Sequence, residues 1–157
     1  MRGFQPLAQI WRYAKTILGV VFRHPLVGVI LIPVLPNGQI VLVKRRDNGL
    51  WSLPGGLVDW GETIPSTICR ELAEETGLTL VQVGRLVGVY SSFDRDPRVH
   101  SVAVAVEVSV TGRFAPIDHL EISDIDAFAP ISLPGMPLAH DHARQIQDYL
   151  RGQTIVD

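Results

Sequence analysis

The 157-residue sequence contains only one cysteine, Cys69. A lone cysteine excludes an intrachain disulfide and a structural zinc site built from several thiolates, and it suits a reducing, cytoplasmic environment. The sequence also lacks a surplus of basic charge, because 14 Lys and Arg residues are outnumbered by 16 Asp and Glu residues. Proteins that bind nucleic acid need positive charge to neutralise phosphates, so we expect no nucleic-acid partner.

Long apolar runs are missing from the N-terminal segment. Its uninterrupted run over residues 17–22 is far shorter than the roughly 20 residues of a membrane-spanning helix. Residues 4–22 instead place apolar side chains at helical spacing, with Arg12 and Lys15 on the other side, which predicts an amphipathic helix. Such a helix packs on its own domain or on a partner subunit more often than on lipid. We therefore expect no membrane association, while a homodimer remains an open alternative.

The hydrophobic content of 46% is sufficient for a folded core, and the length suits one domain of roughly 150 residues. We expect residues 1–24 to form a helical extension and residues 25–157 to form the domain. Turn residues and periodicity predict a pair of antiparallel strands over 27–34 and 39–44, a helix over 63–76, a strand over 101–110, a short strand over 126–128 and a closing helix over 138–151. This order is typical of an α+β domain with a mixed sheet.

Local signals mark the ends and the buried face of the helix over 63–76. Thr63 is a suitable N-cap, and Gly77 stands where a glycine commonly follows a helix. Ile68 and Leu72 are one turn apart, which predicts an apolar stripe that packs on the sheet. Cys69 lies beside this stripe in the sequence, and we expect it to be a small buried side chain rather than a nucleophile.

The same helix carries three glutamates on one side. Glu71, Glu74 and Glu75 stand at positions i, i+3 and i+4, so their carboxylates converge and repel one another. A hard divalent cation such as Mg²⁺ would offset this repulsion, and the glycines at 55–56 would let backbone carbonyls approach it. The alternative is a solvated acidic face on which Arg70 is an ordinary ion-pair partner.

The segment over residues 56–78 resembles the Nudix box, G-x5-E-x7-R-E-U-x-E-E-x-G-U, in which U is an aliphatic residue. All of its defined positions are matched here, by Gly56, Glu62, Arg70, Glu71, Leu72, Glu74, Glu75, Gly77 and Leu78. The resemblance covers about residues 25–150. It implies the Nudix-type α/β/α sandwich around a mixed sheet, with the amphipathic N-terminal helix as an addition.

The resemblance also implies a metal site and a reaction. Mg²⁺ or Mn²⁺ would be held by Glu71, Glu74, Glu75 and the Gly56 carbonyl, and would neutralise charge on a diphosphate. We expect Glu71 to take the proton from the attacking water, with Glu121 and Glu107 as more remote candidates. The remaining box residues, Arg70, Glu62 and Gly77, are expected to shape this catalytic cluster.

Candidate substrate-binding residues lie outside the box. Arg95, Arg98 and His100 surround a proline in a stretch similar to one found in ADP-ribose diphosphatases of the family, and they could clamp a diphosphate. The alternative is an exposed hairpin with Asp–Arg pairs of its own. Further candidates are Arg46, which competes with Arg45 because only one of the two can face the site, and the aromatic residues Trp51 and Tyr90, which would either stack an adenine or belong to the core.

The triplet His140-Asp141-His142 is a possible metal pair by composition alone. Two imidazoles at positions i and i+2 cannot face one ion on a helix. We therefore expect a cap or a surface position for this triplet, bordering the substrate mouth at most.

Taken with the resemblance, these features favour a cytoplasmic, Mg²⁺-dependent pyrophosphohydrolase that acts on ADP-ribose or a nucleoside diphosphate sugar. One alternative is a nucleoside triphosphate pyrophosphatase, which would release pyrophosphate and a monophosphate. Another is a module that binds ADP-ribose without hydrolysing it. The matched box argues against this last alternative.

Overall fold

A computed structural model of the chain describes residues 11–13, 15–16, 24–95 and 99–157. The predicted helix over 4–22 lies largely outside these residues, and so does Arg98, so the structure does not test either prediction. No helix in the described part of the chain is long and apolar enough to cross a membrane.

The described residues form a mixed sheet of eight strands. Its strand order is β3-β2-β1-β6-β5-β8, with β4 paired to β1 and β7 paired to β2. The β1–β6 and β5–β8 pairs are parallel and the others are antiparallel. The strands are β1 (Leu26–Val34), β2 (Ile40–Arg45), β3 (Trp51–Ser52), β4 (Gly55–Leu57), β5 (Thr79–Tyr90), β6 (Ser101–Thr111), β7 (Ile122–Phe128) and β8 (Ile155–Val156).

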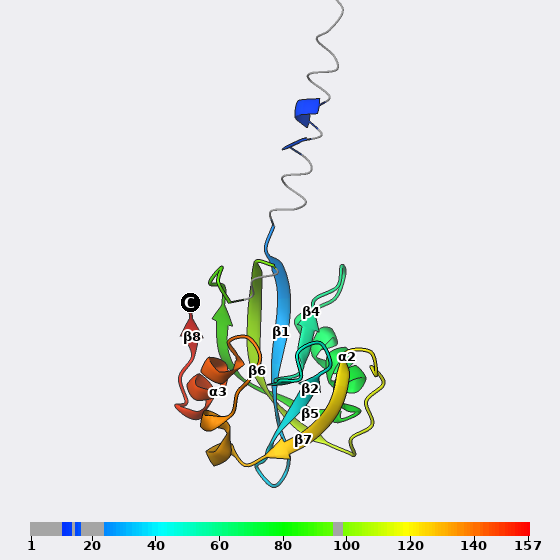
Figure 1. Cartoon of the computed structure of the whole chain (residues 1–157), viewed down its shortest axis with the longest axis vertical. Coiled ribbons are helices and arrows are strands. Elements are labelled where there is room, and N and C mark those ends of the chain that lie inside the picture. The colour runs from blue at the N-terminus through cyan, green and yellow to red at the C-terminus, as the bar shows by residue number, and fades with distance from the viewer. Residues whose placement is uncertain (1–10, 14, 17–23, 96–98) are drawn as a thin grey trace, which may run out of the picture.

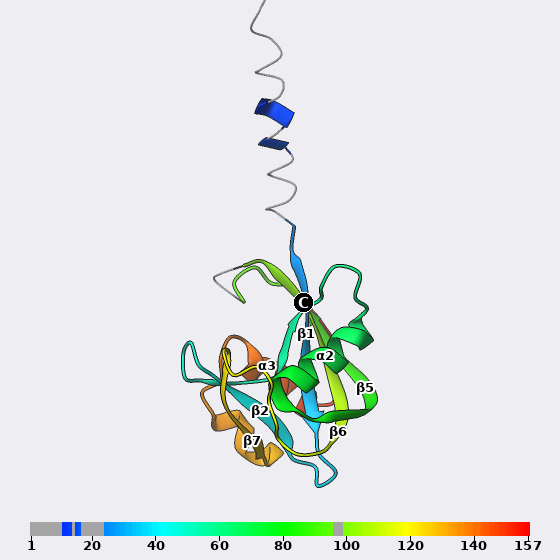
Figure 2. The ribbon, with the colours of Figure 1, turned by 90° about the vertical axis from the view of Figure 1, so that its right-hand side faces the viewer.

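Helices cover both faces of this sheet. Figures 1 and 2 show α2 (Ile64–Thr76) on one side of the central strands and α3 (His142–Leu150) on the other. A short 3-10 helix, η1 (Pro130–Gly135), leads from β7 toward α3. The α+β sandwich and the antiparallel pairing of β1 with β2 confirm the predictions from sequence.

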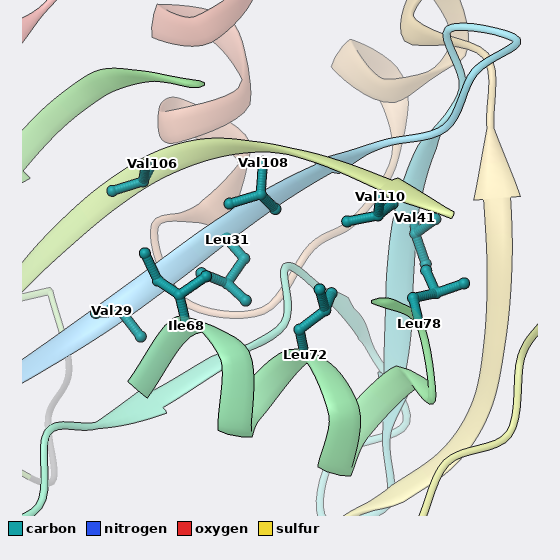
Figure 3. Close-up of a cluster of buried hydrophobic side chains, with 9 residues drawn as sticks. All are labelled: Val29, Leu31, Val41, Ile68, Leu72, Leu78, Val106, Val108 and Val110. Carbon is teal, nitrogen blue, oxygen red and sulfur yellow. The ribbon is translucent and has the colours of Figure 1, made fainter. Parts of the chain in front are cut away.

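The α2 side of the sheet holds one of two hydrophobic clusters (Figure 3). Ile68 and Leu72 of α2 are fully buried against valines of β1 and β6, which confirms the predicted apolar stripe. Burial of each such side chain contributes roughly 1.5–3 kcal/mol. Because these two residues fix how α2 is rotated on the sheet, they also fix where its glutamates point.

The ends of α2 follow the local signals in the sequence. Thr63 accepts a hydrogen bond from the Ser66 N–H, and the Ser66 hydroxyl accepts one from the Thr63 N–H, which completes a capping box. Gly77 adopts φ 72° beyond the last turn. A Cβ there would lie 2.4 Å from the Ala115 carbonyl oxygen, so only glycine fits.

Two predictions on this part of the fold are wrong. Cys69 is exposed, because it lies about 100° around the helix from Ile68 and so leaves the buried stripe. The closing helix begins at His142 rather than at Leu138. Leu138 forms a parallel bridge with Trp51, and the Ala139 N–H donates to the Trp51 carbonyl at 2.8 Å, so this stretch extends the sheet edge instead.

Candidate active site

A cavity of about 780 Å³ opens beside the sheet, between α2 and the residues that precede α3. On one wall it brings together box residues that the sequence predicts to act jointly, namely Gly56, Arg70, Glu71, Glu74 and Glu75. Glu121 lines the same cavity from the loop before β7. The cavity is also lined by Arg95, His140, Asp141 and His142.

The glycines of β4 let two carboxylates approach the backbone. The Gly55 N–H donates to Glu75 Oε2 at 2.8 Å. At Gly56, an added Cβ would lie 2.1 Å from Glu71 Oε1. Gly55 itself adopts φ 153°, and a Cβ there would meet the Val29 carbonyl oxygen at 2.2 Å. Only glycines at these positions allow β4 to pair with β1 while Glu71 lies against it.

Arg70 ties the acidic residues together. Its guanidinium donates to both carboxylate oxygens of Glu62, at 2.9 and 3.0 Å, and to the Leu57 carbonyl at 3.0 Å. Its Nη1 donates to Glu71 Oε1 at 2.7 Å and to Glu74 Oε2 at 3.2 Å. Hydrogen bonds from Arg70 and Thr67 lower the pKa of Glu62 to about 2. Glu62 therefore stays ionised and orients Arg70, as predicted for a residue that shapes the site.

Glu71 and Glu75 are buried, which makes their ionised forms energetically unfavourable. Burial raises the pKa of Glu75 to about 8, and the nearby charges of Glu71 and Glu121 add to this effect. Burial likewise raises the pKa of Glu71. Ionised carboxylates in such surroundings need a cation in addition to Arg70.

The donor set fits a hard divalent cation in its chemistry. Three carboxylates and a glycine carbonyl are the oxygen ligands that Mg²⁺ prefers, and the absence of a side chain at Gly56 leaves Glu71 its place beside that carbonyl. Among the described residues, no three His, Cys, Asp or Glu side chains already stand together as a metal site. Arg70 Nη1 instead donates to both Glu71 and Glu74.

The two remote candidates for the base differ in position. Glu121 lines the cavity and interacts electrostatically with Glu71 and Glu75. Its loop is held by Asp118, whose carboxylate accepts the Glu121 N–H at 3.1 Å. Glu107 lies away from the cavity, 4.0 Å from Arg85 Nε of the neighbouring strand. Glu107 is therefore too far from the glutamates of α2 to serve as the base.

Arg95 reaches the cavity but is already paired. Its Nε and Nη2 donate to the two carboxylate oxygens of Asp141 at 2.6 and 3.1 Å, and its Nη1 donates to the Tyr90 carbonyl at 2.9 Å. Among the described residues, the carboxylate partner of Arg95 is thus Asp141, in the segment that leads into α3. Since its side chain is only 8% exposed, Arg95 has little charge to offer a phosphate.

Four other predicted substrate residues lie outside the cavity lining. Tyr90 is fully buried in the cluster on the α3 side, where its hydroxyl donates to Asp148 at 3.1 Å. Trp51 packs edge-on against Phe128. Arg46 Nε donates to the His119 carbonyl at 3.1 Å, and His100 Nε2 lies 3.2 Å from the Ser91 carbonyl. Of the two competing arginines, Arg45 is the one that lines the cavity.

The triplet at the start of α3 was predicted in part, because Asp141 is the N-cap residue of α3 and all three residues line the cavity. His142 is buried rather than on the surface, and its Nδ1 accepts the Leu53 N–H at 2.9 Å. Burial lowers its pKa to about 3. The triplet lies on the cavity wall because residues 138–139 pair with β3, a long-range contact that no local pattern indicates.

The sheet, the acidic helix and the glycine strand together define a Nudix hydrolase, and the chain belongs to this family, whose NUDIX domain matches residues 24–149. Over 150 residues it is 37% identical to the ADP-ribose pyrophosphatase of Methanocaldococcus jannaschii, covering 89% of this chain and 86% of that protein. It is also 34% identical, over 130 residues, to a putative 8-oxo-dGTP diphosphatase of Bacillus subtilis, covering 83% of each.

A solved structure shows the same arrangement. The NUDIX domain of Shewanella oneidensis NrtR, complexed with ADP ribose, matches with a TM-score of 0.74 and 25% identity, covering 90% of this chain and 97% of that one. The predicted family, fold and similarity to ADP-ribose diphosphatases are thereby confirmed. Nudix hydrolases generally use divalent metals, which agrees with the oxygen-rich donor set.

Proposed function

We propose that the protein is a Mg²⁺-dependent pyrophosphohydrolase that cleaves ADP-ribose into AMP and ribose 5-phosphate. The observation that carries this proposal is the placement of Glu71 and Glu75 against the glycines of β4, at one wall of a cavity of about 780 Å³. A cavity of that size suits a ligand as large as a nucleoside diphosphate sugar. The resemblance to the Methanocaldococcus jannaschii ADP-ribose pyrophosphatase supports the choice of substrate.

Glu71, Glu74, Glu75 and the Gly56 carbonyl would hold the cation. When bound, Mg²⁺ supplies charge neutralisation at the diphosphate and lowers the pKa of a coordinated water. Arg70 orients Glu71 and Glu74 through its hydrogen bonds, and Glu62 orients Arg70.

Glu71 and Glu121 are the two candidates for the group that takes the proton from water. Glu71 Oε1 is engaged by Arg70 and lies against Gly56. The Glu121 side chain makes no hydrogen bond with any described residue and reaches the cavity from a separate loop. This geometry favours Glu121 as the base and leaves Glu71 to the metal.

A substrate panel with Mg²⁺ tests the proposal. The wild-type protein should release AMP and ribose 5-phosphate from ADP-ribose, and hydrolyse 8-oxo-dGTP more slowly. Glu75→Gln and Glu121→Gln should each lower kcat by at least about 100-fold, the usual scale for loss of a metal ligand or a general base. Asp124→Asn removes one exposed carboxylate of β7 and is the matched control.

Two results would overturn the proposal. One is that wild-type protein with Mg²⁺ leaves ADP-ribose intact. The other is that Glu75→Gln hydrolyses it at the wild-type rate. Faster release of pyrophosphate from 8-oxo-dGTP would assign the chain to triphosphates instead.

A further inference from the structure

The part of the cavity lining formed by residues 139–142 is held in place by hydrogen bonds at both of its ends. The Ala139 N–H donates to the Trp51 carbonyl of β3 at 2.8 Å, and the N–H of Leu53, the residue after β3, donates to His142 Nδ1 at 2.9 Å. Between them His140 adopts φ 52°, and it is the one non-glycine residue with positive φ in the described part of the chain. A residue with a Cβ holds that conformation only where its surroundings impose it.

His142 offers the cavity a hydrogen-bond donor. Because Nδ1 accepts the Leu53 N–H, the proton of the neutral ring is on Nε2. Nε2 has no hydrogen-bond partner among the described residues. Gln145 Oε1 is the one side-chain polar atom among these residues that is both fully buried and without a hydrogen bond. Because Nε2 also lacks a hydrogen bond, it must retain some accessible surface. The ring lines the cavity, so Nε2–H is available to a ligand.

The charges around His142 keep it in this neutral form. Burial is the main cause of its lowered pKa, about 3, and His140, Arg95 and Arg45 act in the same direction. The Asp141 carboxylate acts in the opposite direction and raises the pKa of His142. The ring therefore remains a donor through Nε2 at any pH near neutrality.

Asp141 beside it offers a fixed acceptor. Arg95 donates to both of its oxygens, and Gln145 Nε2 donates to Oδ2 at 3.2 Å. Oδ1 receives one of these bonds only, so it can accept another. Gln145 is fully buried, and its own Oε1 is left without a partner while its amide nitrogen holds Asp141. Gln145 thus orients the Asp141 carboxylate while its own amide oxygen makes no hydrogen bond.

We propose that Asp141 and His142 recognise the adenine of the substrate, with Asp141 Oδ1 accepting from the exocyclic amino group and His142 Nε2–H donating to a neighbouring ring nitrogen. This inference rests on the proposed function, because it assumes that a nucleotide lies in the cavity. It assigns the nucleoside end of the substrate to the part of the cavity lined by Asp141 and His142.

Chemistry favours a base over the other parts of such a substrate. Because Arg95 is already paired with both oxygens of Asp141, this ion pair offers a phosphate little net positive charge. Ribose hydroxyls both donate and accept, so they require no donor and acceptor of fixed polarity. An adenine edge places an amino donor next to a ring acceptor. The apolar side chains of Ile30, Leu53 and Ala103 line the same cavity and suit the face of a planar ring.

Replacement of adenine by hypoxanthine tests the inference, because it replaces the 6-amino donor with a 6-oxo acceptor, which cannot donate a hydrogen bond to the Asp141 carboxylate. Wild-type protein should bind AMP at least about 10-fold more tightly than IMP, the scale of one mismatched hydrogen-bond pair. It should also show a similar preference in kcat/KM for ADP-ribose over its inosine counterpart. Binding of AMP and IMP is measured by calorimetry, so this arm does not depend on hydrolysis.

His142→Asn is the decisive variant, because its Oδ1 can still accept the Leu53 N–H while the Nε2 donor is lost. We expect KM for ADP-ribose to rise about 10-fold, kcat to stay within about threefold, and the AMP to IMP ratio to fall toward one. Asp141→Asn presents an amide donor and should narrow or invert the ratio. His24→Asn, at an exposed position outside the cavity, is the matched control and should keep both values.

Equal binding of AMP and IMP by the wild-type protein would overturn the inference, and so would an unchanged ratio in both variants. Failure of the proposed function gives a different result. If ADP-ribose is not hydrolysed but AMP is still preferred over IMP through His142 and Asp141, base recognition is supported and the proposed activity is wrong. If ADP-ribose is hydrolysed without a preference for adenine, the proposed activity is supported and base recognition is wrong.

Discussion

Gly56 shows how one residue serves backbone pairing and chemistry together. It belongs to β4, which pairs with β1, and its missing side chain leaves room for the Glu71 carboxylate. The sequence motif predicts a glycine here because its carbonyl approaches a metal. The structure adds a second reason, since the Glu71 side chain itself needs the space.

Gly56→Ala should therefore impair activity far more than stability. The added Cβ would lie 2.1 Å from Glu71 Oε1, which is the end of a flexible side chain and can move away at modest energetic cost. A displacement of about 1 Å at a catalytic group lowers the rate by about 100-fold. Steady-state kinetics with ADP-ribose and Mg²⁺, together with thermal unfolding, measure the two effects.

The control for this substitution is Gly135→Ala, because no atom lies within 4 Å of a Cβ added there and, like Gly56, it does not have a positive φ. If Gly56→Ala kept the wild-type kcat, then Glu71 would not need its place against β4. The proposed metal site would have to be redrawn.

At the scale of whole elements, α2 was predictable nearly to the residue, whereas the segment before α3 was not. Thr63, Ile68 and Gly77 act through neighbours within one or two turns, so local patterns reveal the start, the buried face and the end of α2. Leu138 and His142 are positioned instead by Trp51 and Leu53, nearly ninety residues earlier in the chain. Periodicity alone therefore extended the closing helix too far toward the N-terminus.

The capping box of α2 yields a prediction at this scale. Thr63→Ala removes the side-chain acceptor of the Ser66 N–H and should lower the free energy of unfolding by about 1 kcal/mol. Activity at 25 °C should stay within about twofold, because the glutamates lie two turns further along the helix. Urea denaturation measures the first quantity and ADP-ribose hydrolysis the second.

Thr111→Ala, at an exposed strand end, is the matched control and should change the unfolding free energy by a few tenths of a kcal/mol. Equal destabilisation by the two substitutions would show that the cap contributes nothing specific. A large loss of activity in Thr63→Ala would show that the first turn of α2 is coupled to the carboxylates.

For the molecule as a whole, the sequence located one wall of the site and left the other undetermined. Glu71, Glu74 and Glu75 lie within one turn of the same helix, so their spacing is sufficient to bring them together. Arg95 and Asp141 come from segments 46 residues apart, so only the tertiary structure brings them together. Tyr90 and Trp51 have aromatic rings that could stack on a ligand, but both pack in the hydrophobic core instead. Which of these two roles an aromatic residue takes depends on tertiary packing.

Two buried groups on these walls give the stability of the metal-free protein opposite dependences on pH. Glu75 has a pKa of about 8 in the folded protein against 4.5 ordinarily, so its contribution is fully favourable below 4.5 and is lost as pH rises toward 8. His142 has a pKa of about 3 against 6.5, so its contribution is present above 6.5 and is lost as pH falls toward 3.

The two slopes oppose each other between pH 4.5 and 6.5, so the unfolding free energy should be nearly flat there and should fall on both sides. Each flank should approach about 1.4 kcal/mol per pH unit. Urea denaturation from pH 3 to 8.5 in a chelating buffer measures the curve. Glu75→Gln should weaken the alkaline fall, with the remainder due to Glu71, whose pKa burial also raises. His142→Asn should weaken the acidic fall. Saturating Mg²⁺ should restore more alkaline stability to the wild-type protein than to Glu75→Gln. An alkaline fall of equal size in wild-type protein and Glu75→Gln would mean that the Glu75 carboxylate is not buried as the structure places it, and that the cation has no unpaired charge to neutralise at this wall.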